Sequence, residues 1–193
     1  NSGLVIDNVQ TNSDGSISFD VTFPDVLVGN GTKDSPYEIR TRQDLNVLSS
    51  SSANIYYKIM NDIHLEGSEF TMIPDFKGVL DGNNKKIGGI KVTGAYGAAF
   101  IDNVDTTAVI KNLTFDRPYI QASDGYSAIL GSLNGQLENI VVSGGTINSN
   151  SRAGGLAGVL NSDGHITNCY TSATVMGNEA GGLLSYMCGG SIV

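Results

Sequence analysis

The chain has 193 residues and a formal net charge of −8, and it contains 25 glycines but no tryptophan. This length is enough for one domain with a sizeable core, and the glycines indicate many tight turns. The acidic balance argues against binding to nucleic-acid phosphates. No apolar run approaches the roughly 20 residues of a transmembrane helix. Cys169 and Cys188 are too few for a disulfide framework, and they leave open one bridge or two free thiols.

The first 24 residues predict a β-hairpin that is separate from the rest of the chain. Residues 16–23 alternate polar and apolar side chains, which is typical of a half-buried strand. Residues 4–9 form a second candidate strand, and the turn residues Ser13, Asp14 and Gly15 lie between the two. Because this hairpin lacks the repeat described below, we interpret residues 1–24 as the end of a preceding β-domain or as an additional edge piece.

The segment from residue 25 onward begins with a turn-rich connection and a short helix. Thr41 and Asp44 have the spacing of a capping box, with aspartate in place of the usual glutamate, and they precede an apolar pattern at Leu45 and Leu48. A solenoid needs cover for the apolar end of its first coil. We therefore predict an N-terminal cap at about residues 37–55 and a solenoid over residues 25–193. We expect the natural protein to continue beyond Val193.

An apolar motif with the spacing Φ-x-x-Φ-x-Φ, where Φ is an apolar residue, recurs through most of this segment. Its first members are 27, 23, 27, 29 and 26 residues apart, and they are Met60, Ile87, Ile110, Leu137, Ile166 and Ile192. Two small residues and one apolar residue, as in Gly154-Gly155-Leu156, come shortly before each of the last four motifs. Short strands separated by turns at such a period predict an all-β fold, namely a right-handed parallel β-helix.

Stacked coils place equivalent residues about 4.8 Å apart along the axis of the solenoid. The apolar members of the motif should therefore form internal columns. The two clearest predicted columns are Leu113, Ile140 and Cys169, and Ile110, Leu137 and Ile166.

An asparagine precedes the middle apolar position in three successive motifs, at Asn112, Asn139 and Asn168. Asp62 and Gly89 take that place in the earlier motifs. Identical amides at strand spacing can form a hydrogen-bonded ladder, and asparagine tolerates the bent backbone of a corner. We predict a structural ladder at these three residues, and three ordinary turn asparagines are the alternative.

The residue between the last two apolar positions of each motif must point outward. The predicted outer line comprises His64, Lys91, Thr114, Val141 and Tyr170. Polar side chains beside an aromatic ring suit contact with a glycan or a cell-surface protein, so the candidate binding residues are His64, Lys91, Thr114 and Tyr170. The alternatives are an ordinary mixed surface or an aromatic platform in lateral loops, formed by Tyr96, Tyr119 and Tyr126.

No catalytic residue, metal site or cofactor is predicted. His64 and His165 lie about four coils apart, too far to share a metal. The loop from Asp81 to Asn84 lacks the full spacing of a calcium loop, and Cys169 should face inward and be inert. Glycoside hydrolysis needs two carboxylates across one groove. The candidates show no pair in register, and they are Asp75, Asp81, Asp102, Asp105 and Asp116.

Two glycine-rich segments resemble the GLUG repeat of bacterial extracellular proteins. They are Gly154-Gly155-Leu156-Ala157-Gly158 and the degenerate copy Gly181-Gly182-Leu183-Leu184, in which Ser185 replaces the last glycine. The resemblance covers residues 29–193 and implies a parallel β-helix in an adhesin-like protein or in an accessory region of a secreted peptidase. The first 24 residues resemble the last strands of an immune-inhibitor-A-type metallopeptidase region, although the chain has no His-Glu-x-x-His motif.

The sequence therefore predicts a non-catalytic module, extracellular or at the cell surface, that acts in adhesion or in binding a glycan or protein. A polysaccharide-active hydrolase or lyase and an accessory region of a secreted metallopeptidase remain the alternatives. We expect no nucleic-acid partner and no membrane insertion by this chain, and the oligomeric state is left open.

Overall fold

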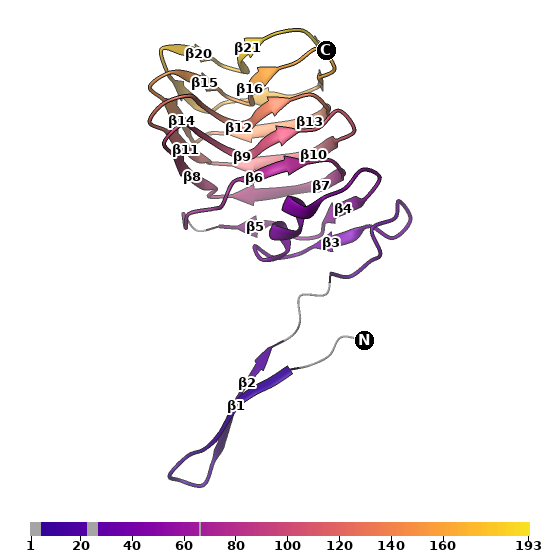
Figure 1. Ribbon diagram of the computed structural model, residues 1–193, viewed down its shortest axis with the longest axis vertical. Helices are drawn as coiled ribbons and strands as arrows, with labels where there is room; N and C mark the ends of the chain where they lie inside the picture. The colour runs from indigo at the N-terminus through magenta and orange to yellow at the C-terminus, as the bar shows by residue number, and fades with distance from the viewer. Residues whose placement is uncertain (1–4, 23–26, 66) are drawn as a thin grey trace.

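The computed structural model describes residues 5–22, 27–65 and 67–193, and it shows a parallel β-helix preceded by a β-hairpin (Figure 1). Three sheets of parallel strands form the walls of the solenoid. Sheet 1 contains β3 (Tyr37–Ile39), β4 (Tyr56–Ile59), β5 (Ile63–His64), β7 (Val79–Gly88), β10 (Val109–Asp116), β13 (Gln136–Ser143), β17 (His165–Thr167), β18 (Tyr170–Thr171) and β22 (Ser191–Ile192). Sheet 2 contains β8 (Lys91–Gly94), β11 (Tyr119–Ala122), β14 (Thr146–Ser149) and β19 (Thr174–Met176). Sheet 3 contains β6 (Ile73–Phe76), β9 (Gly97–Val104), β12 (Tyr126–Leu133), β15 (Arg152–Gly154), β16 (Ala157–Leu160), β20 (Glu179–Gly181) and β21 (Leu184–Met187).

The N-terminal hairpin consists of β1 (Val5–Thr11) and β2 (Ile17–Thr22), which pair antiparallel. Asp14 holds the turn, because its Oδ1 atom accepts hydrogen bonds from the backbone N–H (2.9 Å) and the hydroxyl (2.6 Å) of Ser16. Leu4 and Phe23, at the outer ends of the predicted strands, lie outside the described residues.

A short 3₁₀ helix, η1 (Asp44–Ser50), caps the N-terminal end of the solenoid. The predicted capping box is present: the Asp44 carboxylate accepts a hydrogen bond from the Thr41 N–H (2.8 Å), and the Thr41 hydroxyl accepts one from the Asp44 N–H (3.3 Å). Leu45 and Leu48 are fully buried in the core, where η1 packs against β3 and β6. Within the described residues, no helix is long and apolar enough to cross a bilayer.

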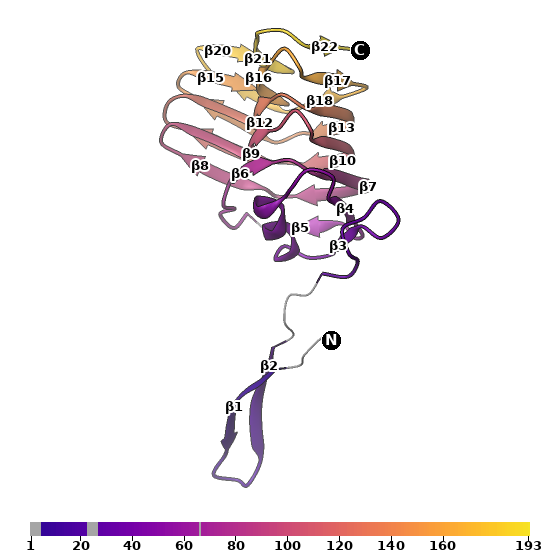
Figure 2. The same ribbon diagram turned by 45° about the vertical axis from the view of Figure 1, so that its right-hand side comes forward.

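The internal columns lie where the repeat places them in the upper coils. Ile110 is opposite Leu137 and Leu137 is opposite Ile166, and all three are buried. Leu113 is opposite Ile140, and the half-buried Cys169 packs against the same core. Figure 2 shows the strands of sheet 1 stacked from β3 at the lower end to β22 at the upper end. The prediction of a parallel β-helix is therefore confirmed.

The coil that contains β7 is longer than the apolar spacing predicts. Asp81 lies opposite Lys111, and Lys85 lies opposite Leu113. Three residues of β7 therefore occupy the corner that Asn112 alone forms in β10.

The predicted register of the first two motifs is wrong by more than this insertion, because the motif that begins at Ile87 does not pair with the motif that begins at Ile110. Leu80, and not Ile87, lies opposite Ile110. Ile87 lies opposite Phe115 on one side and opposite Ile63 on the other. Aligning either Leu80 or Ile87 with Ile110 places a buried apolar residue in the column. The spacing of apolar residues alone therefore cannot distinguish the two alignments or reveal extra residues at a corner.

Candidate functional site

Outward residues of four stacked strands form a strip on sheet 1, which we call the Tyr170 strip. It consists of Lys86 in β7, Thr114 in β10, Val141 in β13 and Tyr170 in β18, each opposite the next. Thr114, Val141 and Tyr170 border a shallow groove of about 290 Å³ whose other wall contains the ladder asparagines. The structure thus brings together two of the predicted binding residues, Thr114 and Tyr170, and adds Lys86 to their line.

The asparagine corner is held by a ladder of side-chain amides. The Nδ2 group of Asn168 donates to Oδ1 of Asn139 (2.6 Å), and Nδ2 of Asn139 donates to Oδ1 of Asn112 (2.9 Å). The φ angles of the three residues lie between +50° and +55°, a left-handed conformation in which a short polar side chain is favoured. Each asparagine therefore serves both the turn of its own coil and the link to the next.

At its N-terminal end the ladder meets a carboxylate. Nδ2 of Asn112 donates to Oδ1 of Asp81 (3.1 Å), which also accepts a hydrogen bond from the N–H of Asn83 (2.8 Å). Asn83 has a φ of +52° and takes part in the longer corner of β7. The places predicted for Asp62 and Gly89 in this column are therefore wrong. Asp62 accepts a hydrogen bond from the N–H of Lys86 (2.9 Å), and Gly89 follows Gly88, which lies opposite Asp116.

His64 and Lys91 lie away from the Tyr170 strip. His64 in β5 is opposite Gly88, at the end of β7. Lys91 begins β8 on sheet 2, where its Nζ atom is 3.4 Å from Oε2 of Glu69. The predicted outer line is therefore wrong for these two residues, because Ile87 lies opposite Phe115 and not opposite Ile110.

The three tyrosines of the alternative aromatic platform occupy different settings. Tyr96 is 81% exposed, and Tyr119 begins β11. Tyr126 begins β12, and its ring covers Gly131, where an added methyl group would lie 2.7 Å from the ring. Its hydroxyl bonds to the carboxylate of Asp102, and burial together with this bond raises the pKa of Tyr126. Tyr126 therefore stabilises sheet 3 and does not belong to a lateral loop.

The aspartates considered for glycan cleavage are each held by a local contact. Asp105 accepts hydrogen bonds from the N–H (3.0 Å) and the hydroxyl (2.9 Å) of Thr107, which lower the pKa of Asp105. The others bind as follows: Asp75 with Asn103 and Lys77, Asp81 with Asn83 and Asn112, Asp102 with Tyr126, and Asp116 with Arg117. These contacts give each carboxylate a structural partner within its own part of the wall.

Both cysteines are free thiols, which settles the question that the sequence left open. Cys169 is half-buried, and burial raises the pKa of its thiol. Cys188 is exposed. Across residues 5–22, 27–65 and 67–193, no three His, Cys, Asp or Glu side chains gather in a group that could hold a metal ion.

A second amide ladder, which the apolar motifs do not reveal, lies on sheet 3. Nδ2 of Asn134 donates to Oδ1 of Asn103 (3.0 Å), and Nδ2 of Asn103 donates to Oδ1 of Asp75 (2.7 Å). Asn134 precedes Asn161 by 27 residues, the spacing of Asn112 and Asn139 in the first ladder. Asn161 does not extend this ladder, however, because its Nδ2 group donates to the Ser132 hydroxyl (2.8 Å).

No protein-family model matches the chain, so the GLUG assignment stays a prediction. The chain is similar to Halomucin of Haloquadratum walsbyi, with 34% identity over an alignment of 177 positions that covers 81% of this chain. The same stretch spans only 2% of the length of Halomucin. Among solved structures, the chain resembles a candidate immunoglobulin A1 protease from Bacteroides ovatus, with a TM-score of 0.67 and 21% identity over 85% of this chain and 57% of that one. This second likeness shows the fold alone.

Proposed function

We propose that the chain is a non-catalytic module of an extracellular or cell-surface protein, and that the Tyr170 strip binds a glycan or a surface protein. The similarity to a small part of Halomucin supports the role of a module within a much longer chain. The groove beside the asparagine ladder supports binding, and it is the observation that carries the proposal.

The chemistry of this groove suits polar ligands with flat apolar faces. Tyr170 is 61% exposed, and its ring offers an apolar face with a hydroxyl at the rim. Asn168 uses only one N–H for the ladder and keeps its second N–H and both lone pairs of Oδ1. Asn139 uses its Nδ2 group for Asn112 and Glu138 and one lone pair for Asn168, which leaves its second lone pair. A sugar that stacks on Tyr170 could therefore exchange hydrogen bonds with Asn139 and Asn168.

The accessory region of a secreted peptidase is a second role that the same fold allows. The candidate protease among the solved structures motivates it, although that likeness extends to the fold alone. The gene sequence upstream of Asn1 tests this role, because a peptidase domain there would support it and a different domain would contradict it.

A glycan array probed with the chain tests binding at the Tyr170 strip. We expect the Tyr170→Ala variant to lose the signals that the unaltered chain gives. Tyr186→Ala is the matched control, because Tyr186 is similarly exposed (52%) but lies on sheet 3. No signal on any glycan, together with no capture of purified cell-surface protein, would contradict the proposal, and so would equal loss in both variants.

A further inference from the structure

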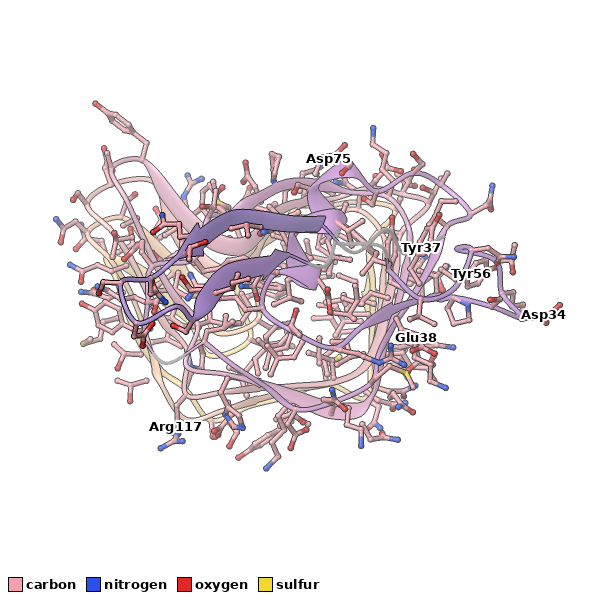
Figure 3. The ribbon with its side chains drawn as sticks, turned by 90° about the horizontal axis from the view of Figure 1, so that it is seen from below. Asp34, Tyr37, Glu38, Tyr56, Asp75 and Arg117 are labelled. Atoms are coloured by element: carbon pink, nitrogen blue, oxygen red, sulfur yellow. The ribbon has the colours of Figure 1, made fainter. Side chains whose placement is uncertain are left out.

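A second surface site lies between sheet 1 and the loop of residues 30–36. The loop is internally bonded, since the N–H of Asn30 donates to the carbonyl of Ser35 (3.0 Å) and the side chain of Asn30 accepts from the Thr32 hydroxyl (2.7 Å). It is fixed to the wall of the solenoid by the N–H of Tyr56, which donates to the carbonyl of Gly31 (2.9 Å). Figure 3 shows the loop projecting past Tyr56, with Asp34 at its tip. The loop and the sheet enclose a cleft of about 320 Å³, a volume in the range of small-ligand sites.

The sheet side of the cleft carries charges of alternating sign. Glu38, Lys58, Asp81, Lys111 and Glu138 lie opposite one another in five successive strands. Successive strands are about 4.8 Å apart, so Lys58 and Lys111 are separated by about 9.6 Å with Asp81 between them. Three of these residues, Lys58, Asp81 and Lys111, line the cleft directly.

The lysines of the cleft have no carboxylate partner. Within the described part of the chain, none of Lys33, Lys58 and Lys111 has its Nζ atom within 4.0 Å of a carboxylate oxygen. Asp81, which lies between two of them, binds Asn83 and Asn112 instead. The carboxylates of Asp34 and Asp81 also line the cleft, so its three ammonium groups leave it a net positive charge in a chain whose net charge is −8. This local positive charge favours an anionic ligand.

The uncharged residues of the cleft provide an apolar surface beside these charges. Tyr56 and Val79 are neighbours on adjacent strands, and Pro36 faces them from the loop. The C–H face of a sugar ring can pack against such an apolar surface, and the ring of Tyr56 provides most of it. The carboxylate of Asp81 can accept a hydrogen bond from a sugar hydroxyl but repels an anion.

We infer that this cleft binds an acidic polysaccharide that carries one anionic group on every second sugar. The anionic groups would bind Lys58 and Lys111, the neutral sugar between them would donate a hydroxyl to Asp81, and Lys33 would close the site from the loop. An extended acidic peptide fits less well, because its side chains on one face are about 6.8 Å or about 13.6 Å apart. A polymer with a charge on every sugar would bring an anion against Asp81.

Calorimetric titration with oligosaccharides of unsulfated chondroitin, which has a carboxylate on alternate sugars, tests this inference. Two charge-assisted contacts are each worth about a factor of ten in affinity, so the Lys58→Gln/Lys111→Gln double variant should bind about 100-fold more weakly. Lys77→Gln is the control, because Lys77 is paired with Asp75 outside this cleft. Polygalacturonate, with a carboxylate on every sugar, and poly-aspartate should bind more weakly than chondroitin.

Three results would overturn the inference: no binding of chondroitin, equal binding by the double variant, or tighter binding of either comparison polymer. If the double variant does not fold, the single variants Lys58→Gln and Lys111→Gln are measured in the same way. Tyr170→Ala should bind chondroitin like the unaltered chain, so a failure here is distinguishable from a failure of the Tyr170 strip.

Discussion

Replacing Asn139 should separate the two contributions of the asparagine ladder to the stability of the solenoid. Asn139 is the middle member, and it both donates to Asn112 (2.9 Å) and accepts from Asn168 (2.6 Å). Its φ of +55° adds a second requirement, because most L-residues are strained in that conformation. Alanine removes both contributions, whereas glycine removes the hydrogen bonds and tolerates the backbone.

The expected losses follow from these two contributions. Two hydrogen bonds at a net value of about 0.5–1.5 kcal/mol each give a loss of about 1–3 kcal/mol for Asn139→Gly. The left-handed backbone adds about 1–2 kcal/mol for a residue with a plain Cβ, so Asn139→Ala should lose about 2–5 kcal/mol in the free energy of unfolding. Asn178→Ala, at an exposed residue between β19 and β20, should change it by less than about 0.5 kcal/mol.

Urea denaturation followed by far-ultraviolet circular dichroism measures these differences. The slopes of the transitions must agree between variants, since the slope reports the surface exposed on unfolding. If Asn139→Gly is as stable as the unaltered chain, the ladder bonds contribute nothing and the corner is an ordinary turn. If Asn139→Ala and Asn139→Gly lose the same amount, the left-handed backbone carries no cost.

Two further experiments test the inward columns and the reactivity of the thiols. Ile140→Ala should destabilise the solenoid by about 2–5 kcal/mol because Ile140 is fully buried, whereas Val141→Ala, on the outer face, should cost less than about 1 kcal/mol; equal losses in denaturation would contradict the inward column. Iodoacetamide at about pH 8 should label Cys188 before Cys169, because burial raises the pKa of the Cys169 thiol and thiolate is the reactive form. Mass spectrometry of the single-cysteine variants measures both rates, and faster labelling of Cys169 would refute the assigned burial.

The sequence was sufficient for the parts of the fold that repeat without interruption. Ile110, Leu137 and Ile166 occur at the same place in coils whose corners each contain one asparagine. Their spacing therefore maps directly onto the internal column. The capping box at Thr41 and Asp44 was also visible, because its partners are only three residues apart.

The sequence was insufficient where a coil changes length at a corner. The corner at Asn83 has two extra residues, and the apolar motif that begins at Ile87 lies opposite Phe115 and not opposite Ile110. His64 and Lys91 therefore lie outside the predicted outer line. Aligning Asn84, which also has a left-handed backbone, with Asn112 as corner residues would have placed Lys86 opposite Thr114. The loop of residues 30–36, which closes the cleft beside Lys58 and Lys111, could not be predicted either. Its position depends on the hydrogen bond between Tyr56 and Gly31 and not on any repeat.

The distribution of partners among charged residues explains why binding is assigned to sheet 1. On sheets 2 and 3 the basic side chains are already paired, as shown by Lys91 with Glu69 and by Arg152 with Glu179. An exposed pair gains little from its own contact, but it satisfies both charges and leaves neither for a ligand. Lys58 and Lys111 each lie between acidic residues of the neighbouring strands, but neither lysine forms a direct ion pair. A ligand anion can therefore reach them without displacing an existing partner, and this difference between the faces makes sheet 1 the surface at which substitutions should alter binding.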